Sequence, residues 1–153
     1  MSDIVLLRSL LTDCRVLVLA VLDGTAPAIG LLPFALDPSG PALIVHASAL
    51  ARHSRGLWDG APFDALVARP EGPGIDPFRI PRLTVRGRVV ALAPGSGEEQ
   101  AAHAIWSARF PDARGLLGFG DFRTSRLEIE RGRLVAGFAA ARDVDPEEIR
   151  HLG

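Results

Sequence analysis

The sequence has 153 residues, of which 48% are apolar and 23% are charged, a balance typical of one soluble globular domain spanning residues 1–153. The net charge of -1 excludes the basic excess of a nucleic-acid-binding protein or of one that binds an acidic membrane surface. The longest apolar run, Val16–Leu22, is too short to cross a bilayer. The single cysteine, Cys14, excludes an internal disulfide and a cysteine-rich metal site. We expect it to be a buried, inert thiol in a cytoplasmic protein.

The first half of the chain predicts one helix followed by hairpin strands. Asp3 is the expected cap of a helix at Ile4–Thr12. Asp23-Gly24 is a strong turn signal, so the strands on its two sides should form a hairpin. Pro33 cannot donate to a ladder and therefore marks an edge, a bulge or a strand end. The expected strands are Arg15–Leu22, Ala28–Leu36, Ala42–Ala47 and Phe63–Ala68, and a short helix capped by Ser48 is expected at Ala49–Trp58.

The second half predicts three further strands and two helices. Ser96 and Glu99 have the spacing of a capping box, which opens a helix that Pro111 ends. Asp145 caps a short final helix. The expected strands are Leu83–Leu92, Phe119–Glu130 and Leu134–Phe138, the last two being joined by a turn at Arg131-Gly132. Because hairpin joins dominate, we expect a mainly β fold with peripheral helices, whose antiparallel strands are numerous enough to close a barrel.

One segment has the composition of an anion site. At the start of the second expected helix, two serines, two arginines and a histidine fall between Ser48 and Arg55. Free backbone N–H groups at a helix start attract anions, and a guanidinium can grip a phosphate with two hydrogen bonds. The segment could therefore hold one phosphate dianion, and the alternative is a capped helix with a solvated basic face.

Two strands carry further candidate features. Gly30 within Ile29–Phe34 would allow a flat ligand to approach the backbone closely, and the alternative is an ordinary core strand with a bulge. Alternation along Arg82–Arg88 places the arginines and Thr84 on one face, which is either a ligand-facing surface or a solvated outer face. The histidines show no close metal-ligand spacing, so no metal site is expected.

Several motifs, taken in order, match a known family along nearly the whole chain, from Leu6 to Leu152. They are Val18–Asp23, Leu32–Gly40, Leu50–Arg55, Pro81–Gly87, Pro111-Asp112-Ala113, Gly120–Arg123 and Gly137-Phe138. The chain resembles the pyridoxamine 5'-phosphate oxidase-like FMN-binding split-barrel superfamily, and within it the short haem-utilisation (HugZ-like) branch.

The resemblance implies an antiparallel split β-barrel of six to seven strands that forms a homodimer, with FMN at the subunit interface. It assigns the phosphate to Arg52, His53, Ser54 and Arg55. It further implies that Gly30, Leu31 and Leu32 line the flavin ring, that Ala47 and Ser48 lie near the ribityl chain, and that Arg82 and Thr84 face the flavin.

The sequence also departs from the family pattern. Gly56 stands where the family usually has Asn, and the substrate-gripping pattern at the C-terminal end of the oxidase is missing. We therefore expect an FMN-binding oxidoreductase with a small-molecule substrate other than pyridoxamine phosphate, and we name no catalytic residue. One alternative is a module that binds or sequesters haem or another cofactor, with His46, His53 or His103 as iron ligand. Another is a dimeric domain that has lost its ligand.

Overall fold

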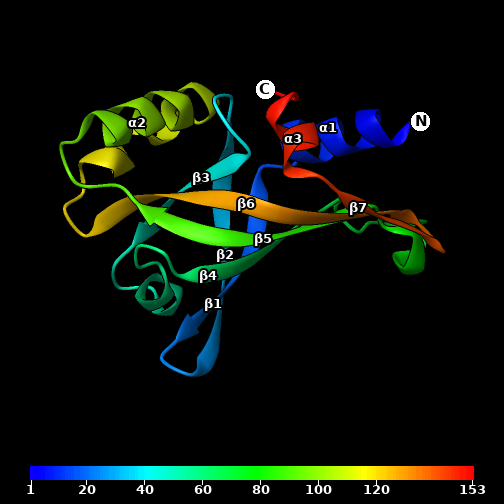
Figure 1. The fold of residues 1–153 in the computed structure, drawn as a ribbon, viewed down its shortest axis with the longest axis horizontal. Coiled ribbons are helices and arrows are strands. Elements are labelled where there is room, and N and C mark those ends of the chain that lie inside the picture. The colour runs from blue at the N-terminus through cyan, green and yellow to red at the C-terminus, as the bar shows by residue number, and fades with distance from the viewer.

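A twisted antiparallel sheet that closes on itself dominates the computed structural model, which describes residues 1–153 (Figure 1). Its strands are β1 (Val16–Asp23), β2 (Ala26–Asp37), β3 (Ala42–Ser48), β4 (Pro62–Ala68), β5 (Arg82–Ala91), β6 (Phe122–Gly137) and β7 (Ala140–Val144). Its helices are α1 (Asp3–Asp13), α2 (Gly97–Arg109) and α3 (Pro146–Arg150), and 3-10 turns occur at η1 (Arg52–Gly56), η2 (Pro77–Arg79) and η3 (Pro111–Gly118). The expected fold class is confirmed.

The strand order is β3-β2-β1-β4-β5-β6-β7, and β3 also pairs with β6. This pairing closes β1 to β6 into a barrel and leaves β7 as an extra strand beside β6. Pro33 lies where β2 changes partners, since it is the last residue paired with β1 and Phe34 is the first paired with β3. The missing N–H of the proline therefore falls at the end of a ladder, one of the positions expected from the sequence.

The predicted turn at Arg131-Gly132 is wrong. β6 runs through both residues as one long strand, with β5 on one side and β7 on the other. The local irregularity there is a bulge, at which Arg86 pairs with Arg131 and Gly87 with Ile129. The reversal of the chain comes later, beside Ala139 with its positive φ of 57°, and β7 was not expected. Pairing on both sides overrides the local turn signal.

The second helix predicted from the sequence is also wrong in length. Only η1 forms, its cap residue is Ala51, and no side chain caps it. Gly56 explains the brevity, because a Cβ there would lie 2.6 Å from the side chain of Val21, so this segment packs directly on β1. Ser2 rather than Asp3 caps α1, whereas the caps expected at Ser96 and Asp145 are present.

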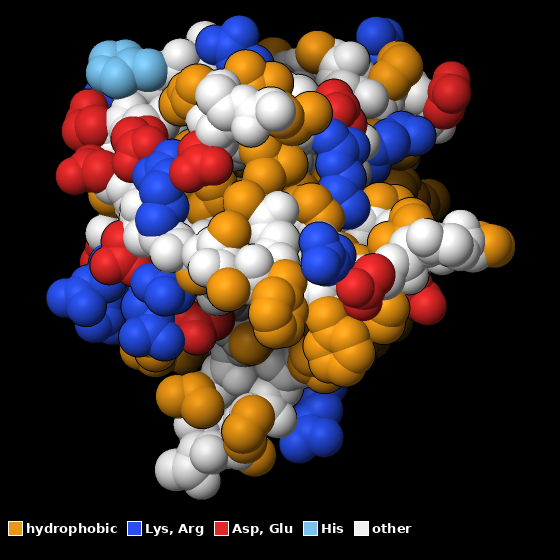
Figure 2. Space-filling model, turned by 90° about the vertical axis from the view of Figure 1, so that its right-hand side faces the viewer, with side chains coloured by type: hydrophobic (Ala, Val, Ile, Leu, Met, Phe, Trp, Pro, Cys, Tyr) orange, Lys and Arg blue, Asp and Glu red, His pale blue; other side chains and the backbone are white.

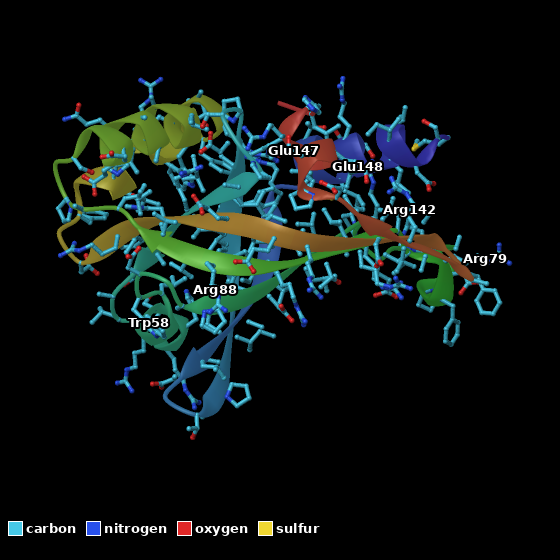
Figure 3. The ribbon with its side chains drawn as sticks, in the orientation of Figure 1. Trp58, Arg79, Arg88, Arg142, Glu147 and Glu148 are labelled. Carbon is cyan, nitrogen blue, oxygen red and sulfur yellow. The ribbon has the colours of Figure 1, made fainter.

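The core has two parts. A large cluster fills the barrel and the space below α1 and α3, and a smaller cluster lies under α2, centred on Trp106 and Phe110. Cys14 is buried as expected and donates to the carbonyl of Ala68, and burial raises the pKa of its thiol. An ion pair joins the last strand to the last helix: Arg142 of β7 lies beside Glu148 of α3 (Figure 3), with Nη2 of the arginine 3.1 Å from a carboxylate oxygen of the glutamate. No helix is long and apolar enough to cross a membrane.

Candidate functional site

A small hollow at one end of the barrel gathers the best anion-binding groups. It has a volume of about 170 Å³ and is lined by Ala47, Ala49, Ser54, Arg55, Leu57, Arg123 and Ser125. These residues come from the end of β3, from η1 and the segments flanking it, and from β6. Two guanidinium groups and the Ser125 hydroxyl in so small a space form a donor set suited to one phosphate-sized anion. We call this hollow the anion pocket.

Strand geometry places the β6 side of the anion pocket. Arg123 pairs with Ala47 across the ladder, and Ser125 follows two positions later on the same face. Nη1 of Arg123 donates to the carbonyls of Gly120 and Phe122 at 2.6 and 2.8 Å, which fixes one edge of its guanidinium. The rest of the guanidinium keeps free donors for a ligand.

The η1 side of the anion pocket is held by Ser54, whose hydroxyl donates to the carbonyl of Ser48 at 2.5 Å. Arg55 lies 3.5 Å from Asp23, and Arg52 lies 3.6 Å from the same carboxylate. Both side chains are about 70% exposed, so these ion pairs hold the arginines weakly. Only Arg55 lines the pocket, and Arg52 lies outside it.

The space beside Gly30 does hold a flat ring, but this ring is the imidazole of His53 and not a ligand. A Cβ on Gly30 would lie 2.6–2.7 Å from ring carbons of His53, so the imidazole occupies the space of the missing side chain. Nε2 of His53 is buried without a hydrogen-bond partner, and burial lowers the pKa of the ring. The structure therefore turns His53 toward β2 and away from the lining of the anion pocket.

The two residues that follow Gly30 point to opposite sides of the sheet. Leu32 is buried in the barrel, whereas Leu31 is 65% exposed on the outer surface. Outward-facing residues of β1 and β2 pair with one another and are all apolar: Val16 with Pro33, Val18 with Leu31, Ala20 with Ile29, and Leu22 with Pro27. Figure 2 shows hydrophobic side chains on the projection at the base of the molecule, which the β1–β2 hairpin forms (Figure 1). We call the eight paired residues the apolar face.

The apolar face continues into a charged one. Across β4 the outward register reaches Thr84 beside Leu66, and Arg86 beside Asp64. A broader hollow of about 400 Å³ opens here, but its arginines face carboxylates. Arg86 donates to both oxygens of Asp64 at 3.0 and 3.1 Å, so this charge is already compensated.

Arg82 and Thr84 lie far from the anion pocket within one subunit. Ser125 of the pocket pairs with Ala91, and the part of β5 from Thr84 to Ala91 spans about 23 Å at about 3.3 Å per residue. Side chains from both ends of β5 therefore cannot grip the same phosphate in a single copy of the chain.

Ser48, placed near the ribityl chain by resemblance, has local partners. Its hydroxyl donates to Asp121 at 3.2 Å and accepts from the N–H of Leu50 at 3.2 Å.

Arg123 and Ser125 were not among the residues expected to bind. Their signal was an alternation of polar residues on one strand directly after Gly120-Asp121, but only the barrel closure shows that they meet η1.

Two of the three histidines considered as iron ligands, His46 and His103, are engaged within the protein, whereas Nε2 of His53 has no partner. Both ring nitrogens of His46 are engaged, with Thr124 and with the carbonyl of Leu116, and His103 shares Thr124 through Nε2. No histidine lines the anion pocket, and no three His, Cys, Asp or Glu side chains group as a metal site. The donors present suit a phosphate or carboxylate group better than a metal centre.

Comparison with solved structures places the fold. No family model and no curated protein matches the sequence. A heme binding protein from Mycobacterium smegmatis superposes with a TM-score of 0.81 at 24% identity, over 99% of this chain and 61% of that protein, so the chain spans about three fifths of its length. HutZ, the heme storage protein from Vibrio cholerae, superposes with a TM-score of 0.75 at 25% identity, over 86% and 92% of the two chains.

A pyridoxamine 5'-phosphate oxidase-like protein from Listeria innocua superposes with a TM-score of 0.61 at 17% identity, over 88% of this chain and 99% of that one. A heme binding protein, a heme storage protein and a protein of the oxidase type thus share the fold of this chain. The expected resemblance is confirmed at the level of the fold: the chain has the split-barrel fold of these proteins, and its likeness to HutZ fits a resemblance to the haem-utilisation (HugZ-like) branch of the pyridoxamine 5'-phosphate oxidase-like proteins.

Proposed function

We propose that the chain is a flavoprotein that binds FMN by its phosphate in the anion pocket and acts as an oxidoreductase on a small molecule. The observation that carries the proposal is the donor set of that pocket: Arg55, Arg123 and Ser125 around a space of about 170 Å³. A phosphate monoester offers the charge and the oxygens that these groups satisfy, and the volume accommodates it.

The roles of the residues follow from their positions. Arg55 and Arg123 neutralise the phosphate from two sides, while the hydroxyl of Ser125 donates to one of its oxygens. The hydroxyl of Ser54 donates to the carbonyl of Ser48 and so holds η1 at the edge of the pocket. The flavin ring supplies the redox chemistry when bound, and the protein holds it and excludes water. The buried thiol of Cys14 suits a reducing compartment, and we place the protein in the cytoplasm.

We further propose that two copies pack through the apolar face. Ile29 and Leu31 are 72% and 65% exposed there. Monomeric soluble proteins rarely expose a continuous apolar surface, and such a surface usually marks an interaction site. A second copy is the partner that suits it, because a two-fold contact places apolar residues on apolar residues. Such a dimer is also how Arg82 and Thr84 of one subunit would approach a cofactor held by the anion pocket of the other.

Haem is the second candidate, and the observation that favours it is the likeness to haem-handling proteins. The two functions differ in what they require of the pocket. A haem would use the arginines for its propionates and would need an iron ligand, whereas FMN needs only the phosphate grip. Titration with haem and with FMN separates them, through a shifted Soret band or through quenched flavin fluorescence.

The decisive variants are Arg55→Ala and Arg123→Ala, with Arg52→Ala as a matched control of the same charge change. Each pocket arginine should contribute about 1.5–3 kcal/mol, so either substitution should weaken FMN binding about 13- to 160-fold. Arg52→Ala should change the affinity by less than about threefold, because Arg52 lies outside the pocket. Equal losses in all three variants would show only a diffuse effect of charge, and undetectable FMN binding by the native protein would end the proposal.

A further inference from the structure

A third hollow lies on the outer face of the sheet, where β5, β6 and β7 run side by side (Figure 1). Its volume is about 370 Å³, about twice that of the anion pocket. The polar side chains of its lining are Thr84, Arg86, Arg131, Arg133 and Asp143, and none of them lines the anion pocket. We call it the arginine hollow.

A bulge in β6 brings Arg131 to this face. Ile129 is buried in the barrel and Glu130 is exposed, so strict alternation would turn Arg131 inward again. The bulge instead pairs Arg131 with Arg86 and leaves Glu130 as the extra residue. Arg131 is therefore exposed directly after another exposed residue, and it joins the outward-facing arginine of β5.

Positive charge exceeds negative charge in the arginine hollow. Arg86 donates to both carboxylate oxygens of Asp64, at 3.0 and 3.1 Å. Nη1 of Arg133 donates to Asp143 at 2.8 Å. Arg131 forms neither an ion pair nor a side-chain hydrogen bond. Three arginines thus face two carboxylates, which leaves one positive charge uncompensated.

Two of these arginines also oppose each other across the ladder, since Arg86 and Arg131 are paired residues. Paired residues of antiparallel strands have Cβ atoms about 4.5–5.5 Å apart, and like charges at such positions are destabilising. Glu130 lies 3.8 Å from Arg88 and forms no ion pair with Arg131. An anion bound between the two opposed guanidinium groups would be attracted by both and would relieve their repulsion.

The groups left free around the arginine hollow are hydrogen-bond donors. A guanidinium carries five N–H bonds, and all five are free in Arg131, whereas Arg133 engages Nη1 alone. Thr84 pairs with Arg133 across the ladder and adds an exposed hydroxyl. Guanidinium forks match the oxygens of carboxylate and phosphate groups. The half-buried side chain of Val135 provides an apolar wall beside these donors.

We propose that the arginine hollow is a second anion-binding site, which takes a small molecule with a carboxylate or phosphate group and holds that group on Arg131. Thr84 and Arg133 supply further donors to the same group. The volume leaves room for a remainder of the molecule, which lies against Val135. This site goes beyond the proposed binding of FMN and does not depend on it, because the anion pocket contributes no residue to the arginine hollow.

Succinate and inorganic phosphate are the probes that test the site. Each is titrated into isotope-labelled protein at constant ionic strength, and the backbone amide and arginine Nε–H signals are followed by NMR. This readout separates the arginine hollow from the anion pocket, because the two share no residue. We expect saturable shifts at Thr84, Arg131 and Arg133.

The decisive variant is Arg131→Gln, which should weaken binding at this site at least about tenfold, the scale of one hydrogen bond to a charged group. Arg131→Lys should restore only part of the affinity, because an ammonium group keeps the charge but lacks the planar fork. Thr84→Val keeps the shape of the side chain without its hydroxyl and should weaken binding about 2- to 13-fold.

Arg114→Gln is the matched control for the change of charge. Arg114 is exposed on η3, forms no ion pair and lies outside the arginine hollow. Its substitution should change the affinity for either probe by less than about twofold. Equal weakening in Arg131→Gln and Arg114→Gln would reflect net charge alone and would overturn the site.

The remaining outcomes separate the source of the anion and the two proposals. Shifts that do not saturate, or that persist unchanged in Arg131→Gln, overturn the site. If an acidic side chain of a second copy is the occupant, the native protein binds neither probe and Arg131→Gln weakens self-association in sedimentation, which also overturns it. Probe binding that persists in Arg123→Ala, together with no FMN binding by the native protein, supports the arginine hollow and overturns only the proposed function.

Discussion

The contact between Gly30 and His53 gives a prediction whose size follows from the geometry. A Cβ added at position 30 would lie 2.6 Å from Cε1 and 2.7 Å from Cγ of the imidazole, against an ordinary contact of 3.4 Å or more. In Gly30→Ala the ring must therefore move by nearly 1 Å out of a packed position. Overpacking of this kind costs about 1–3 kcal/mol, which corresponds to about 2–4 °C of Tm per kcal/mol for a chain of this size.

A double-mutant cycle isolates the cause. Once His53→Ala has removed the ring, the added methyl group meets no obstacle, so Gly30→Ala should cost little in that background. We expect a coupling free energy of about 1–2 kcal/mol, measured by denaturant unfolding of the native protein, both single variants and the double variant. Strict additivity of the two single effects would refute the assignment of Gly30 to His53, and would return this glycine to a role in admitting a ligand.

Three further predictions concern the surface, the pH dependence and the bulge. Leu31→Asp should raise the dimer dissociation constant, measured by sedimentation or sizing, roughly 30- to 800-fold. Leu31 is 65% exposed, and burying that surface in each of two copies contributes about 2–4 kcal/mol. Ile4→Asp on α1 is the control, and a native protein that is already monomeric would contradict the proposed interface. The pKa values of His46 and His53 in the folded protein both lie below 6.5, so the unfolded chain binds more protons below that pH. The free energy of unfolding should therefore be highest above pH 6.5 and decline as the pH falls toward those lowered pKa values. A free energy of unfolding that rises on acidification over that range would contradict the prediction. Gly87→Ala should cost more than about 3 kcal/mol by denaturant unfolding, because its Cβ would collide with the backbone carbonyl of Glu128 at the bulge, and a loss below about 1 kcal/mol would show that the bulge relaxes freely.

Most of the fold could be predicted from the sequence because turn chemistry and alternation are local signals. Asp23-Gly24, the Ser96 cap and the Asp145 cap all act within a few residues, and each marks a true boundary. Arg131-Gly132 misled because its local signal for a turn is real, yet pairing with β5 and β7 uses the same residues in a continuous bulged strand. Tertiary pairing decides such positions, and no window of sequence contains it.

The site was less accessible to sequence reasoning. Ser54 and Arg55 were expected and do line the pocket, but a glycine at position 56 lets η1 pack onto Val21, which shortens the helix on which the phosphate argument relied. Contacts between residues far apart in the chain supplied the rest. Barrel closure through the β3–β6 ladder brings Arg123 to the pocket.

The affinity for FMN compared with that for riboflavin tests the central claim most directly, because the two molecules share the flavin ring and differ in the phosphate alone. If Arg55, Arg123 and Ser125 hold that phosphate, FMN should bind at least about a hundredfold more tightly than riboflavin to the native protein at pH 7.5. Equal affinities for the two would contradict the account, since the anion pocket would then contribute nothing to binding.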